Sequence, residues 1–253
     1  MKITFLGTGT SQGVPFIGCD CAVCTSPDPR DKRLRTSVWI ETPQASIVID
    51  SGPDFRYQML RANVLRLDAI LFTHSHKDHV AGLDDVRAYN YRQNKAMEVY
   101  ASEQTQEVLK REFSYVFSGD SYPGIPQINL NTIDGKPFSI NGLEITPIRT
   151  LHYKMEVFGF RIGNFTYITD ANYIAPAELE KAKGSKAFVI NALRHKEHIS
   201  HYTLSEAIEI AKQVGAENSY FTHISHQLGL HIEIDSHLPS GMHLAYDTLT
   251  LAL

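Results

Sequence analysis

Three histidines and one aspartate fall within the six positions 74–79 of the chain, in the segment THSHKDHVAG. The four residues are His74, His76, Asp78 and His79. Imidazole and carboxylate groups are the ligands that zinc and related divalent ions prefer in proteins. Without a partner, such groups burden a core and gain nothing on a surface. Because chance rarely places four of them so close together, the segment predicts a metal site.

Further candidate ligands stand at the ends of later strand-like segments. His152 ends IRTLH, Asp170 ends YITD and His223 ends YFTH, just as His74 ends LFTH. A lone histidine such as His152 is more often a satisfied polar residue than a ligand. However, the C-terminal ends of neighbouring strands can lie side by side on one edge of a sheet. We therefore expect these side chains to converge with the first cluster.

The combined set has too many ligands for one tetrahedral ion. It suits two ions, each with three protein groups, that share one carboxylate. Two neighbouring ions hold a bridging hydroxide and stabilise both the attacking and the leaving oxygen of a displacement. The pattern therefore favours metal-assisted hydrolysis.

The three cysteines of the chain, Cys19, Cys21 and Cys24, all lie in the segment GCDCAVC. An odd number of cysteines clustered this tightly does not make an ordinary disulfide framework. In a reducing compartment the cluster is typical of a metal site. Three free buried thiols are the alternative.

The composition indicates a folded soluble protein. The chain has 253 residues, of which 43% are hydrophobic and 21% are charged, and this length suits one large domain or two small ones. No apolar run approaches the roughly 18 residues needed to cross a bilayer, and the start lacks the features of a signal peptide. We therefore expect a cytoplasmic protein without a membrane partner.

The charge balance argues against nucleic acid as a partner, because the net charge is −4 and nucleic-acid binders usually carry a basic surplus. The one basic run, RDKRLR at 30–35, is interpreted as a solvated loop. A rim that attracts phosphate is the alternative for this run.

Hydrophobic patterning predicts a mixture of strands and helices. Helices are expected over 53–65, 79–93, 103–117 and 204–214, the last with a capping box at Thr203 and Glu206 and with Gly215 at its end. Strands are expected over 2–7, 37–42, 46–52, 68–74, 97–102, 128–133, 138–150, 157–170, 187–193 and 218–225. With no linker in sight, this order predicts a single layered α/β domain over 1–253.

The segments THSHKDHVAG, LHY, YITDAN and FTHISH together resemble the metallo-β-lactamase superfamily. The resemblance implies an α/β (α+β) fold, a four-layer αββα sandwich with a dinuclear metal site at the edge of its two sheets. By the same resemblance, Asp170 bridges the ions, and Asp50 orients a ligand histidine. The first ion is then held by His74, His76 and His152, and the second by Asp78, His79 and His223.

The segment GTGTSQGVPFIGCDCAVC narrows the resemblance to the phosphoribosyl 1,2-cyclic phosphate phosphodiesterases of phosphonate breakdown. That family implies a hydrolase with two divalent ions, zinc or manganese, that opens a small cyclic phosphodiester. It also implies a separate structural zinc, held by Cys19, Cys21, Cys24 and His226. Three thiolates and one imidazole form a closed tetrahedral set, which agrees with a structural role.

His201 aligns with the family's histidine that contacts the substrate phosphate, so it is expected to protonate the departing alkoxide. Asp78 is expected to share in handling the proton while it ligates metal. His195 and His198 are nearby candidates for the same role, and the sequence does not separate the three.

Two other functions stay open. One is an RNA-processing nuclease of the same superfamily, although no RNA-gripping insertion is visible. The other is a non-catalytic biosynthesis or carrier protein that shares the cysteine zinc site. The segment 114–130, rich in aromatic and turn residues, either forms a wall over the site or closes the core, and we favour the core. A homodimer is also left open.

Overall fold

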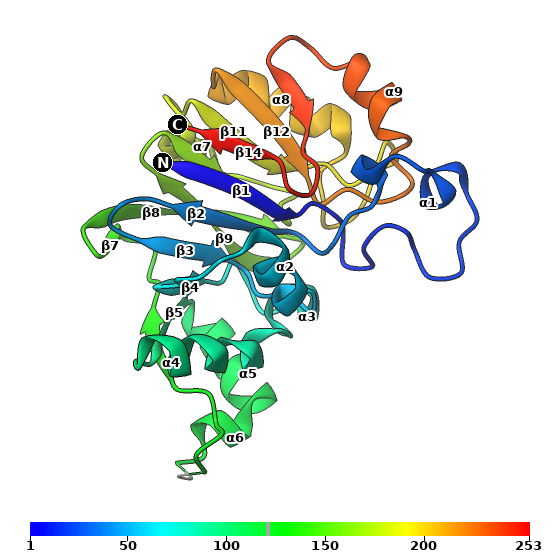
Figure 1. The fold of residues 1–253 in the computed structure, drawn as a ribbon. Helices are drawn as coiled ribbons and strands as arrows, with labels where there is room; N and C mark the ends of the chain where they lie inside the picture. Colours follow the sequence, from blue (N-terminus) through cyan, green and yellow to red (C-terminus); the bar gives the residue numbers. More distant parts are fainter. Residues whose placement is uncertain (120–121) are drawn as a thin grey trace.

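The computed structural model describes residues 1–119 and 122–253, whose strands form two seven-stranded sheets (Figure 1). The first sheet has the order β14 (Thr250–Ala252), β1 (Lys2–Gly7), β2 (Ser37–Glu41), β3 (Ser46–Ile49), β4 (Ala69–Leu71), β5 (Met97–Ala101) and β6 (Ile128–Thr132). The second has the order β13 (Met242–Leu244), β12 (Asn218–Thr222), β11 (Ala187–Asn191), β10 (Phe165–Tyr167), β9 (Met155–Ile162), β8 (Leu143–His152) and β7 (Phe138–Ile140).

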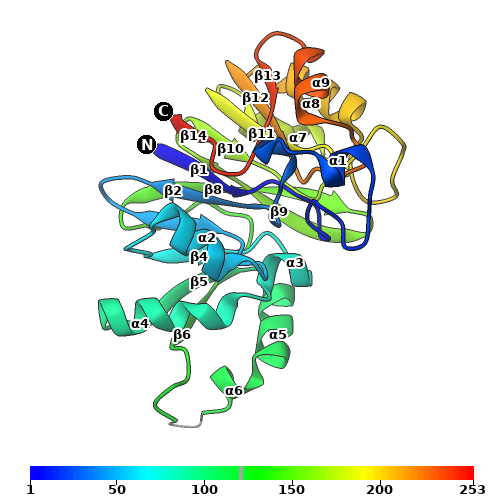
Figure 2. The same cartoon turned by 45° about the vertical axis from the view of Figure 1, so that its right-hand side comes forward.

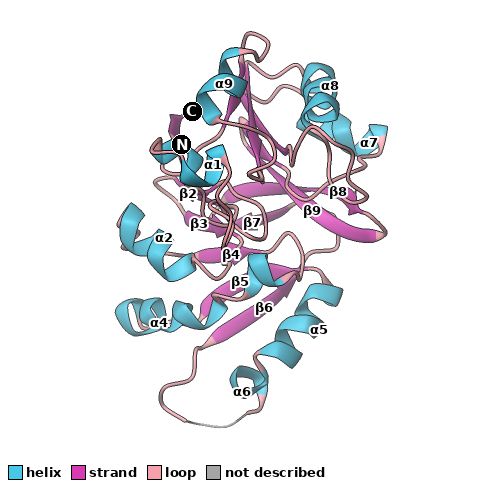
Figure 3. Cartoon of the chain, turned by 90° about the vertical axis from the view of Figure 1, so that its right-hand side faces the viewer, coloured by secondary structure: helices cyan, strands magenta, loops and turns pink. Residues whose placement is uncertain are grey.

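Helices cover the outer face of each sheet, so the molecule has the four layers of an αββα sandwich, and the predicted fold class is confirmed (Figures 2 and 3). Against the first sheet lie α2 (Phe55–Ala62), the 3₁₀ helix η2 (Leu83–Val86), α4 (Arg87–Gln93), α5 (Glu103–Glu112) and the short α6 (Ser114–Phe117). Against the second lie α7 (Pro176–Leu179), α8 (Leu204–Val214) and α9 (His231–Ser236). In the described part of the chain, no helix is long and apolar enough to cross a membrane.

The inner strands β3 and β4 of the first sheet are buried on both faces, which explains why they are continuous apolar runs in the sequence. Successive side chains of a strand point to opposite faces. In β3, Ile47 and Ile49 pack between the two sheets, whereas Val48 packs under the helices. The core between the sheets therefore fixes the orientation of every strand end that carries a candidate ligand.

Two predicted helices are interrupted in the structure. The helix expected over 79–93 is divided into α3 (Lys77–Val80), η2 and α4. The helix expected over 103–117 ends at Glu112, because Phe113 leaves the helical conformation with φ −112° and ψ 42° before α6 begins. The helix α8 was predicted correctly, with the capping box of Thr203 and Glu206 and with Gly215 in the left-handed conformation.

The aromatic segment 114–130 is divided between core and surface. Val116, Phe117 and Ile128 pack against the core under α5, as the core interpretation predicts. Tyr115 and Tyr122 are exposed. Positions 120 and 121 of this segment lie outside the described residues.

The basic run 30–35 is not the solvated loop that the sequence suggested. Arg33 is 3% exposed, and its guanidinium donates to Thr8 Oγ1 at 2.9 Å. Asp31, within the same run, is 1% exposed. This interpretation was wrong because hydropathy does not reveal a polar network that forms between distant segments.

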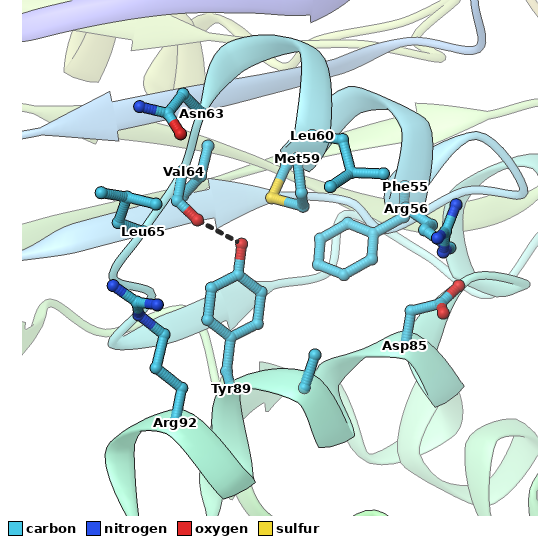
Figure 4. Close-up of a pocket in the computed structure, with 11 residues that line it drawn as sticks. Phe55, Arg56, Met59, Leu60, Asn63, Val64, Leu65, Asp85, Tyr89 and Arg92 are labelled. Atoms are coloured by element: carbon cyan, nitrogen blue, oxygen red, sulfur yellow. Dashed lines mark hydrogen bonds between the residues drawn. The ribbon is translucent and has the colours of Figure 1, made fainter.

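A cavity of about 310 Å³ separates α2 from α4 (Figure 4). Phe55 and Met59 form its apolar wall, and the Tyr89 hydroxyl donates across it to the carbonyl of Val64 at 2.9 Å. None of the candidate metal ligands lines this cavity. It belongs to the packing of the first helical layer.

Candidate metal centre

The candidate ligands come from the ends of four strands in the two sheets. His152 is the last residue of β8, and His223 follows β12 directly. His74 and Asp170 lie a few residues beyond the ends of β4 and β10. The short helix α3 then carries Asp78 and His79 back to the same edge. Segments far apart in the sequence therefore meet at one place.

The candidate ligand atoms lie in two adjacent groups, whose members the sequence analysis assigns to two separate ions. One atom each from His74, His76 and His152 lie within 4.8 Å of one another, and so do atoms of Asp78, His79, Asp170 and His223. The Asp170 carboxylate lies between the groups. One of its oxygens is 3.2 Å from His223 Nε2 and 4.0 Å from His74 Nε2.

Buried nitrogens without a partner face this cluster. His79 Nε2 and both ring nitrogens of His223 are buried and make no well-aligned hydrogen bond within the described residues, although a carboxylate oxygen lies 3.1 Å from His79 Nε2 and another 3.2 Å from His223 Nε2. Leaving such groups unsatisfied costs about 1–3 kcal/mol each. Divalent ions held by His79, His223 and the carboxylates would satisfy the Nε2 atoms, so the residues present fit a metal site.

The electrostatics of the cluster depend on its carboxylates. Burial lowers the pKa of His79, but the charges of Asp78, Asp170 and Asp50 outweigh it and raise this pKa well above its usual value. Burial, with the nearby charge of His79, lowers the pKa of His74 well below its usual value. Without a metal the cluster therefore holds a proton on His79, and a metal ion has to displace it. Metal affinity should fall as the pH falls.

Asp50 holds two of the candidate ligand histidines in place through hydrogen bonds, one directly and one through Thr73. Its Oδ2 accepts from His79 Nδ1 at 2.7 Å and from the Thr73 hydroxyl at 2.9 Å. Because that hydroxyl proton goes to Asp50, Thr73 Oγ1 accepts from His74 Nδ1, which is 2.9 Å away. These bonds leave both Nε2 atoms directed to the metal cluster. The family resemblance implied that Asp50 orients one histidine. The role of Thr73 was not predicted, because no spacing pattern indicates it.

Three residues of this centre have a backbone conformation that side chains disfavour. The φ angles of Asp50, Asp170 and His223 are +64°, +53° and +56°. Positive φ is uncommon for residues other than glycine, and such strain persists where the surrounding structure imposes it. The chain therefore holds these three side chains in fixed positions.

His201 lies against both ligand groups, just before α8. Its ring centre is 4.6 Å from that of His152 and 4.7 Å from that of His223, and its Nδ1 is 3.9 Å from Asp170. His198 is half-buried and lies one ring farther out, 5.0 Å from His201. His195 is exposed and contacts none of these rings. Burial lowers the pKa of His201 to about 3, so its imidazole is neutral near pH 7.

The cysteine cluster forms a second candidate metal centre. Atoms of Cys19, Cys21, Cys24 and His226 lie within 4.8 Å of one another, and His226 Nδ1 is 3.4 Å from the sulfurs of both Cys19 and Cys21. Hydrogen bonds from the Cys24 backbone and from His226 lower the pKa of Cys21 to about 6, whereas burial raises that of Cys24 to about 11. Three sulfurs and one imidazole suit tetrahedral zinc.

The chain matches the β-lactamase superfamily domain over residues 45–224, a range that includes all seven candidate ligands of the first centre and excludes the cysteine cluster. An octanoyltransferase of Porphyromonas gingivalis is 41% identical over 252 residues, which are 98% of this chain and 51% of that protein. A ribonuclease Z of Bradyrhizobium diazoefficiens is 27% identical over 162 residues, 62% of this chain and 48% of that protein. The chain spans about half the length of these curated relatives.

Among solved structures, a diphosphatase from the PhnP family superposes with a TM-score of 0.93 at 41% identity, covering 100% of this chain and 97% of that one. Zinc-bound PqqB from Methylobacterium extorquens superposes with a TM-score of 0.78 at 16% identity and covers 100% of both chains, which shows the shared fold.

Proposed function

Because the chain belongs to the β-lactamase superfamily, we propose that it is a metal-dependent hydrolase of small phosphodiesters. A cyclic phosphate such as phosphoribosyl 1,2-cyclic phosphate is the proposed substrate. The observation that carries this proposal is the pair of adjacent ligand groups around Asp170, with His201 facing both. The similarity to a diphosphatase of the PhnP family supports phosphoryl chemistry.

The proposed cofactors are two divalent ions, zinc or manganese, at the first centre and one zinc at the cysteine cluster. When bound, the pair of ions would supply an activated water and neutralise charge on the phosphoryl oxygens. His74, His76 and His152 would hold one ion, and Asp78, His79 and His223 the other, with Asp170 between them.

In this proposal His201 donates a proton to the departing oxygen. Its ring is neutral in the free protein, because burial lowers its pKa to about 3. The negative charge of a bound phosphodiester would raise this pKa and favour the protonated ring. Asp78, 3.1 Å from His79 Nε2, is proposed to share in the proton transfer.

We also propose that the chain forms one domain over 1–253, acts in the cytoplasm and has neither a membrane nor a nucleic acid as its partner. A homodimer remains a prediction.

The structural zinc would hold the segment that contains Cys19, Cys21 and Cys24 beside the first centre. Backbone hydrogen bonds already join this region, since Thr10 N donates to the carbonyl of Ile224 at 3.1 Å.

Acyl thioesters are a second candidate substrate class. The relative named octanoyltransferase is 41% identical along nearly all of this chain, although that protein is twice as long. The substrate class can be decided with one panel: ribose 1,2-cyclic phosphate, a chromogenic diester, a phosphomonoester, a transfer-RNA precursor and an octanoyl thioester.

We expect about three ions per chain and turnover that is selective for diesters. Cleavage of the thioester or of the RNA instead would overturn the proposed substrate class. One tightly held ion and no turnover, even after zinc or manganese is added, would favour a non-catalytic role.

The variant His76→Ala is the cleanest test of the site. The His76 side chain is exposed, so its removal leaves no hole in the core. We expect turnover to disappear and the melting temperature of the chelator-treated protein to stay the same. The matched control is His195→Ala, which removes an exposed histidine outside the cluster and should retain activity. Undiminished turnover of His76→Ala would contradict the assignment.

A further inference from the structure

The cavity between α2 and α4 has the size and the lining of a small-molecule site (Figure 4). It lies within the first helical layer and has a volume of about 310 Å³. Pockets for small molecules begin at about this volume, and apolar and aromatic side chains line them together with a few polar groups. Well-packed protein interiors contain few voids larger than a water molecule. The cavity therefore offers room for a small ligand.

The wall of the cavity is apolar and partly aromatic. Phe55 and Tyr89 contribute their rings, and the thioether of Met59 lies on the same wall (Figure 4). Two further lining residues, Leu60 and Leu65, are 62% and 54% exposed, so they lie at the mouth. A ligand with an apolar body would cover their side chains and remove apolar surface from water.

Hydrogen bonds hold this wall in place. The Tyr89 hydroxyl donates to the carbonyl of Val64 at 2.9 Å, and the backbone N–H of Val64 donates to the carbonyl of Met59 at 3.0 Å. These bonds join α4 to the C-terminal end of α2 along one side of the cavity (Figure 4). Because the wall is already formed, a ligand does not have to order it on binding.

The positive charges at the two ends of the cavity differ in their surroundings. At one end Arg56 lies near the carboxylate of Asp85, which compensates its charge (Figure 4). At the other end Arg92 forms no ion pair with any residue of 1–119 or 122–253. Burial raises the pKa of Tyr89 to about 12, and the charge of Arg92 opposes this rise. The guanidinium of Arg92 therefore places an uncompensated charge beside the aromatic wall.

We propose that this cavity is a ligand site, separate from the metal centre, for a small carboxylate with an aromatic body. The ring of the ligand packs against Phe55, Met59 and Tyr89, because rings attract other rings and the methionine sulfur. Its carboxylate lies at Arg92, since a planar guanidinium binds a carboxylate through two parallel hydrogen bonds. A neutral ligand would leave this charge without a partner, and a cationic ligand would be repelled.

The test uses three probes that share one ring and one chain length: 3-phenylpropanoate, 3-phenylpropan-1-ol and 3-phenylpropylamine. Their affinities for the intact protein are measured by isothermal titration calorimetry. We expect the acid to bind about fivefold more tightly than the alcohol, as one charged contact at an exposed arginine would give. The amine should bind most weakly. No binding of the acid, or equal binding of the acid and the amine, would overturn the proposal.

The variant Arg92→Gln tests the charged contact. The acid and the alcohol should then bind equally, while the affinity for the alcohol stays as in the parent. Arg111→Gln, at an exposed arginine of α5 outside the cavity, is the matched control and should keep the fivefold preference. A preference that survives in Arg92→Gln would mean that the carboxylate binds elsewhere, for example at the metal centre, and would overturn the site.

The variant Ala88→Leu tests the cavity itself. Ala88 lines the cavity from α4 and is exposed, so a leucine there can extend into the cavity without displacing the core. We expect the affinity for the acid and for the alcohol to fall at least tenfold, with no loss in the melting temperature of the free protein. The control is Ala177→Leu, at an exposed position of α7, which should bind both probes like the parent. Unchanged affinities in Ala88→Leu would overturn the site, and this result does not depend on whether the protein hydrolyses phosphodiesters.

Discussion

At the scale of single residues, Asp50 links the metal ligands to the fold. Its carboxylate is fully buried, and it accepts from His79, from the Thr73 hydroxyl and from the Thr73 backbone. One oxygen therefore fixes the tautomer of His79 directly and that of His74 through Thr73. Without this support both imidazoles could rotate or donate a proton toward the metal.

The variant Asp50→Asn tests this support. An amide presents an N–H₂ group where one carboxylate oxygen stood, so it cannot accept all three bonds. We expect metal affinity or activity to fall by about 10–100-fold, as for other partners of ligand histidines. The measurement is a metal titration of the chelator-treated protein. The control is Asp84→Asn, at a partly exposed carboxylate of η2, and equal affinities of the two variants would contradict the role of Asp50.

The convergence of the candidate ligands could be predicted from the sequence, because only a few side chains bind divalent ions and their spacing is distinctive. The same is true of Asp50, which precedes the motif in IVIDSG. Thr73 could not be predicted. It acts through hydrogen bonds that any threonine can make, and only the three-dimensional arrangement shows which threonine does.

At the scale of elements, a contact between two glycines positions α3. The backbone N–H of Gly82 donates to the carbonyl of Ser51 at 2.8 Å. A Cβ at Gly52 would lie 2.0 Å from the carbonyl oxygen of Asp78, and a Cβ at Gly82 would lie 2.2 Å from that of Gly52. This close approach also explains why the predicted helix over 79–93 is interrupted. The interruption could not be predicted, because hydrophobic periodicity contains no information on a contact with a distant loop.

The variant Gly52→Ala should therefore damage the metal centre without touching a ligand. Relief of the clash requires α3 to move away from the loop after β3, and Asp78 and His79 move with it. We expect the free energy of unfolding to fall by about 2 kcal/mol. We also expect weaker binding of the ion that is assigned to Asp78, His79 and His223. The measurements are denaturant unfolding and metal stoichiometry. Gly142→Ala is the control for the metal site: its Cβ would meet nothing within 4 Å, so only the strain at its φ of +83° lowers stability, and metal binding should stay normal. Normal binding of the ion assigned to Asp78, His79 and His223 in Gly52→Ala would contradict this role of Gly52.

The cysteine cluster should stabilise a segment that has little other support. Helix α1 (Ala22–Thr25) has four residues and no side-chain cap. The variant Cys21→Ser should lose the structural zinc, since binding of such an ion is coupled to folding. We expect a loss of about 2 kcal/mol, which is about 6 °C in the melting temperature of a chain of this size.

Zinc content and thermal unfolding check this prediction together. The exposed neighbour Asp20 provides the control, because Asp20→Ala changes the same segment without removing a sulfur. An unchanged melting temperature in Cys21→Ser would show that the cluster does not stabilise the fold.

At the scale of the whole molecule, the first and last strands of the chain pair at one edge of the first sheet. The strand β14 pairs with β1, and the N-terminal amino group donates to the carbonyl of Leu253 at 2.7 Å. The strands β13 and β14 were not predicted from the sequence, because both are three residues long and gain stability only from partners that are distant in the sequence. Local patterning predicted the long buried strands and could not predict these short edge strands.

A buried polar network joins the same distant segments. The guanidinium of Arg33 contacts Thr8, the carbonyl of Ala245 and, at 3.1 Å, the Nδ1 atom of His231. Because an arginine only donates, His231 Nδ1 must accept, so this ring has to remain neutral. Protonation of His231 would therefore place two positive charges against each other in the core.

This network makes stability depend on pH in a specific window. Burial, with the charges of Arg33 and Arg30, lowers the pKa of His231 to about 4, whereas the unfolded chain has a value of about 6.5. Between these pH values the unfolded state binds more protons than the folded state. The contribution of the neutral His231 to the free energy of unfolding is therefore fully present above about pH 6.5 and is lost as the pH falls toward 4. From pH 7 to pH 5 the loss is about 2 kcal/mol.

The variant His231→Asn isolates this loss from that of the other histidines. The amide oxygen of asparagine takes the place of Nδ1, accepts from Arg33 and does not titrate. We expect the drop in unfolding free energy between pH 7 and pH 5, measured with urea, to be about 2 kcal/mol smaller in the variant than in the parent. His237→Asn, at an exposed histidine beyond the end of α9, should keep the parent's pH dependence. Equal drops in the parent and in His231→Asn would mean that the network tolerates a charged His231. Acid would then not destabilise the pairing of β1 with β14 through this residue.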